Sequence, residues 1–459
     1  MNPGAMRSLK LLLGLAAVLF GFSAQAQPEF DRGERMDWWR EARFGMFVHW
    51  GLYSGLAGTW KGQPAPHDEN LEHIQRLVDA DTHTYAAEAI PKFRPAEGFA
   101  AAWAELAKQA GCIYVVFTTK HHEGFALHDS KLTQYDAGDV VGRDLVREIT
   151  EALRKEGLKV GFYHSVIDWH HPQYDYTKAK YPSYPKGNIP MTVGPRDHDV
   201  YVDYLHGQVD ELISNYGPVD ILWWDYSSFG FDGDKAWRAG DLIAMCRQKH
   251  PHVIMNNRLF RRPEAGFSYD GGADLSQPLD PRFGDFGTPE KHIPEDFAPL
   301  MDWETCMTMN HTWGYSEHDH DWKSSETIIR QLVDVVSKGG NYLLNIGPKG
   351  DGSIPEPSLK IMADVGQWMA TNGEAIYGTS KSPIDGPDFD GRITTKDDVH
   401  YLHLFSRPDS GKVTVRLPGS RATLLQGKQE LEVRRGQGET TIHLPEVLPD
   451  AIATVIRLD

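Results

Sequence analysis

The run from Val219 to Asp225, VDILWWD, joins an apolar strand to two tryptophans and a terminal aspartate. Removing a charge from water is costly unless that charge is paired or hydrogen-bonded. A carboxylate at the carboxyl end of a barrel strand, between indole rings, is therefore typical of a working group in an active site. The competing interpretation is a surface aspartate that ends the strand and caps the residues after it.

Polar side chains also follow the ends of other predicted strands. They are His49 at the end of the first strand, His121 and His122 after the second, His164 at the end of the third, and Arg258 after the fifth. If these strands are parallel, their carboxyl ends meet at one face, and these groups should line one pocket. Hydrogen-bonding groups between aromatic walls suit a small polyhydroxylated ligand.

Hydrolysis of a glycosidic bond needs two carboxyl groups with different roles. One attacks or stabilises the anomeric carbon, and Asp225 is the candidate for that role. The other protonates the leaving oxygen and should come from a later strand or its loop, where Glu290 and Glu304 are the contenders. From composition alone, a solvated loop acid is the better description of Glu290.

A metal centre is the competing interpretation of the histidines. Adjacent His121 and His122 would point to opposite sides of a regular strand, and only a bend would let both face one centre. The sequence has no H-E-x-x-H motif, and His318 and His320 lie in a predicted loop. The three cysteines lack the spacing of a zinc motif, so three buried thiols are the simplest prediction, with one disulfide as the alternative. We therefore expect neither a metal nor a cofactor.

Strands that alternate with helices predict the fold of the larger part of the chain. Strands are expected at 44–49, 113–118, 159–164, 219–224, 253–256 and 341–346, with helices at 99–110, 143–155, 202–215, 241–249, 324–337 and 358–371. This alternation implies parallel pairing through right-handed crossovers. The number of units, and the absence of G-x-G-x-x-G after the first strand, favour a (β/α) barrel over a dinucleotide-binding sheet.

Residues 260–300, rich in glycine, proline and aspartate, are predicted to be long loops of the kind that gather at the active-site face of a barrel.

The hydrophobic pattern of the sequence changes after Gly378. Beyond Gly378, short alternating runs at 400–405, 412–417, 423–424, 431–434, 440–444 and 453–458 predict an antiparallel β-sandwich. The expected domains are an export signal at 1–26, a catalytic barrel at 27–378 and the sandwich at 379–459.

The first 26 residues have the pattern of an export signal. Arg7 and Lys10 precede a short apolar run from Leu11 to Phe22, and Ala24-Gln25-Ala26 resembles a cleavage site. We expect a mature chain that begins near Gln27, in a periplasm or outside the cell, without a membrane anchor. The formal charge of −17 argues against nucleic acid as a partner and fits a neutral substrate. The oligomeric state, a homo-oligomer included, is left open.

Taken together, several motifs resemble those of α-L-fucosidases of glycoside hydrolase family 29. The resemblance covers roughly residues 34–380 in chain order, and the combination is far more specific than any single motif. The motifs are FGMFVHWG at 44–51, KHHEGF at 120–125, YHS at 163–165 with Asp168-Trp169, YGP at 216–218 leading to Trp223 and Asp225, Asn257-Arg258, WETC at 303–306, WGY at 313–315, SKGGN at 337–341, LNIGP at 344–348 and NGEAIY at 372–377.

This resemblance implies a distorted (β/α)8-like, TIM-type barrel with a C-terminal β-sandwich, and exo-cleavage of terminal α-L-fucose with retention of configuration. It places the nucleophile on Asp225. It places the acid/base on Glu290, which follows Thr288-Pro289, in preference to Glu304. The sugar-binding residues that it implies are His49, His121, His122, His164, Trp223, Arg258 and Trp313.

One departure from the family pattern concerns the loop after the first strand. Where the family often has Glu-Trp-Ile-Met, this chain has Glu72-His73-Ile74-Gln75. We place Glu72 and His73 in the substrate site, with Glu72 holding a fucose hydroxyl. His73 replaces the tryptophan contact and alters the side of the pocket that faces the aglycone.

These observations predict two-step hydrolysis of a fucosylated oligosaccharide or glycoconjugate. Asp225 would form a fucosyl-enzyme, while Glu290 protonates the leaving oxygen and then deprotonates water. For that role we expect Glu290 to be buried against apolar walls, which would help it to keep its proton. Two other classes stay open: a fucose-binding module without catalysis, and a metal-dependent hydrolase that uses the same histidines.

Overall fold

The computed structural model describes residues 32–66, 70–175, 196–227, 230–262, 275, 278–295, 300–384 and 386–459. The predicted export signal at 1–26 lies outside these residues. Within them, no helix has both the length and the apolar character needed to cross a membrane.

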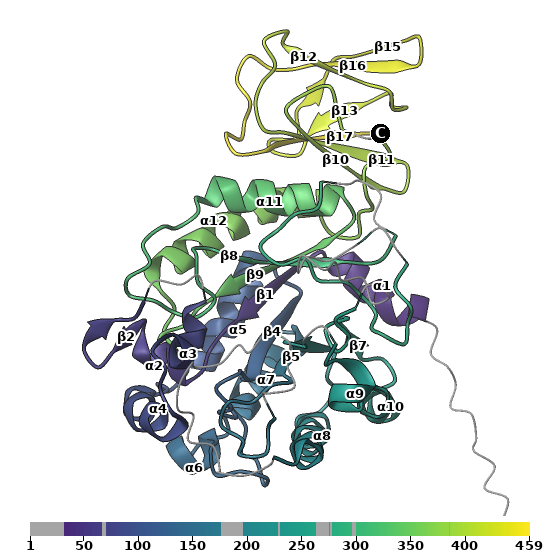
Figure 1. Cartoon of the computed structure of the whole chain (residues 1–459). Helices are drawn as coiled ribbons and strands as arrows, with labels where there is room; N and C mark the ends of the chain where they lie inside the picture. Colours follow the sequence, from purple (N-terminus) through teal and green to yellow (C-terminus); the bar gives the residue numbers. More distant parts are fainter. Residues whose placement is uncertain are drawn as a thin grey trace, which may run out of the picture.

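A parallel sheet forms the centre of the larger unit (Figure 1). Its strand order is β7-β6-β5-β4-β1-β9-β8, and each of its neighbouring pairs is parallel. The strands are β1 (Phe44–Val48), β4 (Tyr114–Lys120), β5 (Lys159–Ser165), β6 (Ile221–Asp225), β7 (Ile254–Met255), β8 (Glu304–Thr308) and β9 (Asn341–Ile346). The strand pattern of the sequence is confirmed except at β8, which it does not predict.

An irregular segment, residues 285–291, closes this sheet into a barrel. It runs between β7 and β8, where Asp285 N donates to Met255 O at 2.7 Å. At its far end, Glu290 and Cys306 form an isolated parallel bridge. The segment takes the position of an eighth strand, which confirms the distorted (β/α)8-like barrel. Part of the predicted loop region 260–300 is therefore barrel wall.

Helices surround the barrel, and side-chain caps mark where several of them begin. Asp144 accepts a hydrogen bond from Arg147 N at the start of α7, and Ser324 accepts one from Thr327 N at the start of α11. The helices are α1 (Arg32–Ala42), α2 (Leu52–Leu56), α3 (Ile74–Leu77), α4 (Thr82–Ala89), α5 (Phe99–Ala110), α6 (Ala137–Val141), α7 (Leu145–Lys155), α8 (His198–Asn215), α9 (Gly233–Trp237), α10 (Ala239–Lys249), α11 (Ser325–Ser337) and α12 (Glu356–Asn372). The shorter elements are the 3₁₀ helices η1 (Leu71–His73), η2 (Ile90–Lys92) and η5 (Gly373–Ala375), and the hairpin strands β2 (Thr59–Trp60) and β3 (Gln63–Pro64).

Side chains fill the interior of the barrel. Phe47 and Trp223 pack with their ring centroids 5.0 Å apart. Trp39 of α1 lies at the end of the barrel where the strands begin. Its carbonyl accepts a hydrogen bond from Asn341 Nδ2 at the start of β9. The opposite end of the barrel is where the strands finish, and Asp225 ends β6 there. The cysteines are buried and free, as predicted, at Cys112, Cys246 and Cys306.

Two antiparallel sheets follow the barrel and confirm the predicted sandwich. One has the order β10-β11-β17-β13-β14 and the other β12-β16-β15, and the two share an apolar core. Figure 1 shows this unit beside α11 and α12, and Trp368 Nε1 of α12 donates to Ala453 O at 3.0 Å. The strands are β10 (Gly391–Lys396), β11 (Val399–Leu404), β12 (Lys412–Val415), β13 (Ala422–Leu424), β14 (Glu430–Leu431), β15 (Val433–Gly436), β16 (Glu439–His443) and β17 (Thr454–Leu458).

Candidate active site

Asp225 is the last residue of β6 and lies at the carboxyl end of the barrel. Arg258 Nη1 donates to its Oδ1 at 2.7 Å, and the Tyr163 hydroxyl donates to its Oδ2 at 2.8 Å. The side chain is only 15% exposed. Both carboxylate oxygens are therefore held and shielded from solvent. This rules out the competing interpretation, in which Asp225 is a surface aspartate that ends the strand. Asp225 is an oriented anion that faces the pocket.

Arg258 joins Asp225 to the second predicted carboxylate. Its Nη2 donates to Glu290 Oε2 at 2.9 Å, and its Nε donates to Thr288 Oγ1 at 2.7 Å. The guanidinium also lies over the ring of Trp223, 4.5 Å from the ring centroid. Charge-assisted contacts of this kind are strong and directional. One guanidinium therefore holds both carboxylates at the same end of the pocket.

The two contenders for the acid/base role lie at different depths. Glu290 lies near the end of the closing segment, at the rim, and its side chain is 43% exposed. Glu304 begins β8, is fully buried, and accepts hydrogen bonds from the Tyr114 hydroxyl and from Trp223 Nε1. Because β8 is parallel to its neighbours, its first residue lies towards the end of the barrel away from the mouth. The geometry favours Glu290, but the expected burial of its carboxyl group is wrong, since rim exposure and the pair with Arg258 replace apolar walls.

The burial of Glu304 leads to a testable effect on stability. Burial raises the pKa of Glu304 to about 7, against hydrogen bonds from Tyr114 and Trp223 that lower it. The unfolded-state pKa is about 4.3, so between these values the folded protein keeps a proton that the unfolded chain has lost. The free energy of unfolding must then fall as pH rises through that window. Above the window, the charged Glu304 costs on the order of 4 kcal/mol.

Glu304→Gln should remove this pH dependence, because the amide resembles the protonated acid. We expect the melting temperature of the variant to rise relative to wild type as pH is raised from about 5 to about 8.5. Calorimetry across that range checks this, with the exposed Glu326→Gln as the control that should show no such trend. A melting difference that does not change with pH would mean that Glu304 is ionised throughout.

Three predicted histidines meet across the pocket from Arg258. The ring centroid of His121 lies 4.0 Å from that of His122 and 5.7 Å from that of His49. Asn345 Oδ1 lies 2.8 Å from His49 Nδ1, and Ser165 Oγ lies 2.7 Å from His122 Nδ1. Burial lowers the pKa of His49 to about 4, and it holds the pKa values of His121 and His122 well below the usual range. Neutral imidazoles can both donate and accept, which suits sugar hydroxyls.

A turn after β4 lets both His121 and His122 face the pocket. The strand ends at Lys120, its register with β5 shifts between Thr118 and Lys120, and Gly124 N donates to His121 O at 3.0 Å. Strand alternation therefore does not govern the two histidines. The turn is the bend that the sequence analysis required for both histidines to face one centre.

His164 is the predicted site residue that the fold does not bring to the pocket. On β5, Tyr163 reaches Asp225 and Ser165 reaches His122, so His164 between them points to the outer face of the sheet. Its Nδ1 lies 2.9 Å from Thr119 Oγ1. We correct the prediction accordingly: Tyr163 takes the place in the pocket that was given to His164.

Glu72 and His73 approach the pocket from η1. Gly314 N donates to Glu72 Oε2 at 3.3 Å, and burial raises the pKa of Glu72 to about 8. Glu72 can therefore present a proton to a ligand at neutral pH. The ring of His73 lies 5.0 Å from that of His122 and 5.5 Å from that of Trp169, centroid to centroid. Glu72 therefore lies beside Gly314, and His73 lies beside His122 and Trp169.

Trp313 forms the aromatic wall beside His49. The two ring centroids are 5.0 Å apart, and Trp313 is almost fully buried. Lys291, which follows Glu290, places its Nζ 5.5 Å from the Trp313 ring. An indole face next to hydrogen-bonding imidazole suits a ring that has one apolar and one polar side.

The structure adds Tyr226, which the sequence reasoning missed. It follows Asp225 directly, with a φ of 78°, a conformation that is costly for a residue with a bulky side chain. Its ring centroid lies 4.5 Å from that of His122. Such strain gathers at functional sites, and no sequence pattern would have revealed it. Tyr163, by contrast, was accessible through the alternation of β5.

The assembled pocket can do one kind of chemistry well. It combines an oriented carboxylate, a second carboxylate at the rim on the same guanidinium, neutral histidines and two tryptophan walls. Retaining glycosidases place two carboxyl groups about 5–5.5 Å apart around the anomeric carbon. Contacts from Asp225 and Glu290 to neighbouring nitrogens of Arg258 are compatible with that arrangement.

Comparison with known proteins agrees with this chemistry. The family model described as alpha-L-fucosidase matches residues 23–374. Tissue alpha-L-fucosidase from Bos taurus is 29% identical over 93% of this chain and 88% of its own length, and the Mus musculus protein is 30% identical over 92% and 91%.

Solved structures give the same result. Alpha-L-fucosidase isoenzyme 1 from Paenibacillus thiaminolyticus superposes with a TM-score of 0.81 at 38% identity, covering 93% of this chain and 99% of that one. A trapped covalent intermediate of a GH29 alpha-L-fucosidase from Bacteroides thetaiotaomicron, in complex with 2-fluoro-fucosyl fluoride, has a TM-score of 0.78 at 28% identity, covering 93% and 96%.

Proposed function

The chain belongs to the α-L-fucosidase family, and from that membership we propose that Asp225 and Glu290 carry out its reaction. The protein is a glycoside hydrolase that removes terminal α-L-fucose with retention of configuration. Retention requires two successive displacements at the anomeric carbon, so one carboxylate must act as nucleophile and the other must transfer a proton twice. Fucosylated oligosaccharides or glycoconjugates are the proposed substrates.

In the first step, an oxygen of Asp225 attacks the anomeric carbon while the bond to the leaving oxygen breaks. Glu290 gives its proton to that oxygen, and the sugar is left bound to Asp225 as an ester. Arg258 has two parts in this step. It orients Asp225 through Nη1, and its Nη2 contact with Glu290 must loosen so that Glu290 can carry the proton.

In the second step, water attacks the same carbon and Asp225 departs as the carboxylate. Glu290, now without its proton, takes one from the water. The Tyr163 hydroxyl and Arg258 stabilise the carboxylate that is released, because each contacts a different oxygen of Asp225. The enzyme then returns to its starting state, with Asp225 as the free carboxylate and Glu290 carrying the proton.

The sugar hydroxyls are assigned to the neutral donors and acceptors opposite Arg258. His49, His121 and His122 contribute ring nitrogens, and Glu72 contributes a carboxyl group. Trp223 and Trp313 supply the apolar faces. Hydrogen bonds that strengthen as positive charge builds on the sugar would lower the barrier rather than merely bind the substrate.

One observation carries this proposal: a single guanidinium, that of Arg258, contacts both carboxylates at the mouth of the barrel. The test is hydrolysis of 4-nitrophenyl α-L-fucoside followed by proton NMR at a high enzyme concentration. We expect the α anomer of L-fucose to form first, before mutarotation. If the β anomer formed first, or if α-L-fucosides were not turned over, the proposed mechanism would be wrong.

A further inference from the structure

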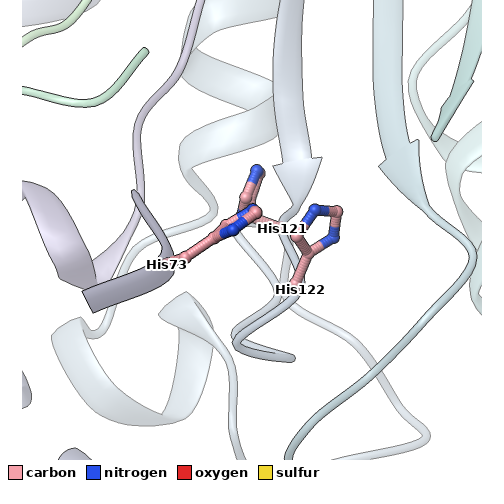
Figure 2. Close-up of side chains that lie close together, drawn as sticks. All are labelled: His73, His121 and His122. Carbon is pink, nitrogen blue, oxygen red and sulfur yellow. The ribbon is translucent and has the colours of Figure 1, made fainter. Parts of the chain in front are cut away.

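His73, His121 and His122 form a cluster that the hydrolytic mechanism does not require as a unit. Each offers a ring nitrogen, and these three atoms lie within 4.8 Å of one another. Figure 2 shows His73 reaching from its own segment towards the two histidines that follow β4. All three side chains are buried. Two separate segments thus bring three imidazole groups into one small volume.

Two nitrogens of this cluster are buried without a hydrogen-bond partner. Among the described residues, neither His73 Nδ1 nor His121 Nδ1 has one. His122 Nδ1 is used by Ser165, so its Nε2 is left on the side of Asp225, 3.8 Å from Oδ2. Buried polar atoms normally have partners, so two unpartnered nitrogens in one cluster of potential ligands call for an explanation, and a bound ion is one.

We propose that His73, His121 and His122 bind one divalent transition-metal ion of the Zn²⁺ type, and that the bound ion excludes the sugar. Imidazole ligands select zinc, copper and nickel over magnesium and calcium, which prefer oxygen. At zinc–nitrogen distances of 2.0–2.1 Å the nitrogens should be about 3.3 Å apart, so the rings must close by up to about 1.5 Å. Asp225 or water completes the coordination.

The exclusion of sugar follows from shared atoms and rests on the proposed function. His121 and His122 are assigned to sugar hydroxyls, and a metal ion takes the same lone pairs. An ion beside Asp225 would also hold the carboxylate that attacks the anomeric carbon. The metal is therefore an inhibitor of the hydrolase, which is the reverse of the metal-dependent mechanism considered from the sequence.

The test combines direct binding with kinetics on the full chain. Calorimetric titration with Zn²⁺ in a buffer that does not chelate metal should give one site per chain. His73→Gln removes one of the three ligands and should weaken binding at least tenfold. The exposed His311→Gln, which loses a surface contact with Asp321, is the matched control and should bind zinc as the wild type does.

In the kinetic arm, Zn²⁺ should raise the KM for 4-nitrophenyl α-L-fucoside without changing kcat, and a chelator should reverse the effect. Mg²⁺ at about 1 mM should not inhibit, because three imidazole nitrogens beside a single carboxylate are poor ligands for an ion that prefers oxygen. The metal site is overturned if no zinc binds below about 1 mM or if His73→Gln binds zinc as tightly as the wild type. Zinc that binds in a His73-dependent manner but lowers only kcat overturns the exclusion of sugar. The calorimetric arm needs no turnover, so it still tests the metal site if the proposed function fails.

Discussion

Asp225→Gly is expected to lower kcat/KM for 4-nitrophenyl α-L-fucoside by three decades or more, about 4 kcal/mol of transition-state stabilisation. The substitution removes the attacking oxygen that Arg258 and Tyr163 hold in position. It also opens a space next to the anomeric carbon. Azide should enter that space and restore nitrophenol release, with β-fucosyl azide as the product, because a single displacement inverts the configuration.

The matched control is Asp225→Asn, which also lacks a nucleophile but fills the space that azide needs. We expect it to be as inactive as the glycine variant and to respond far less to azide. Nitrophenol release measures the rate, and NMR of the product gives its configuration. A glycine variant within tenfold of the wild type, or an azide product of α configuration, would take the nucleophile role away from Asp225.

Glu290→Gln should show the second large effect, and its size should depend on the leaving group. Proton transfer to a leaving oxygen typically contributes 10²–10⁴-fold. For an alkyl α-L-fucoside or a fucosylated disaccharide, we expect kcat/KM to fall within that range. For α-L-fucosyl fluoride, whose leaving group needs no proton to depart as a stable anion, we expect a fall of less than about tenfold.

Glu304→Gln is the comparison that separates the two contenders. Glu304 is buried at the start of β8, behind Trp223, so its replacement should change all substrates by a similar and small factor. Steady-state kinetics on the fluoride and on the disaccharide give the ratio for each variant. If the leaving-group dependence appeared in the Glu304 variant and not in the Glu290 variant, the acid/base assignment would have to be exchanged.

The barrel was largely predictable because its strands carry a strong local signal. β1, β5, β6 and β9 are apolar runs between helices with clear periodicity, and each was found within two residues of its ends. β8 has no such signal, because Glu304, Thr305 and Thr308 give it a polar composition although every residue in it is buried. The closing segment 285–291 also lacks a local strand pattern, since its position depends on pairing with both neighbouring strands.

Site residues were predictable where a reactive residue type stands at the end of a strand. They were less predictable where the face of the sheet to which a side chain points decided its role. Asp225 and Arg258 end up in contact, as expected of groups at the ends of adjacent strands. His164 was misplaced because a shift of one residue along β5 moves a side chain to the other face of the sheet. His121 and His122 face the same side because of a turn after β4, and the surrounding sequence does not predict that turn.

The sequence by itself determined the family, the alternation of strands and helices, and the residue types gathered at the strand ends. These depend on local composition and on motifs that are contiguous in the chain. Only the tertiary structure decided that Glu290 shares a guanidinium with Asp225, that Glu304 is sealed behind Trp223, and that His73 meets the histidines after β4. The physical reason is that such contacts join segments far apart in the chain, and burial sets their charge states only once the barrel has closed.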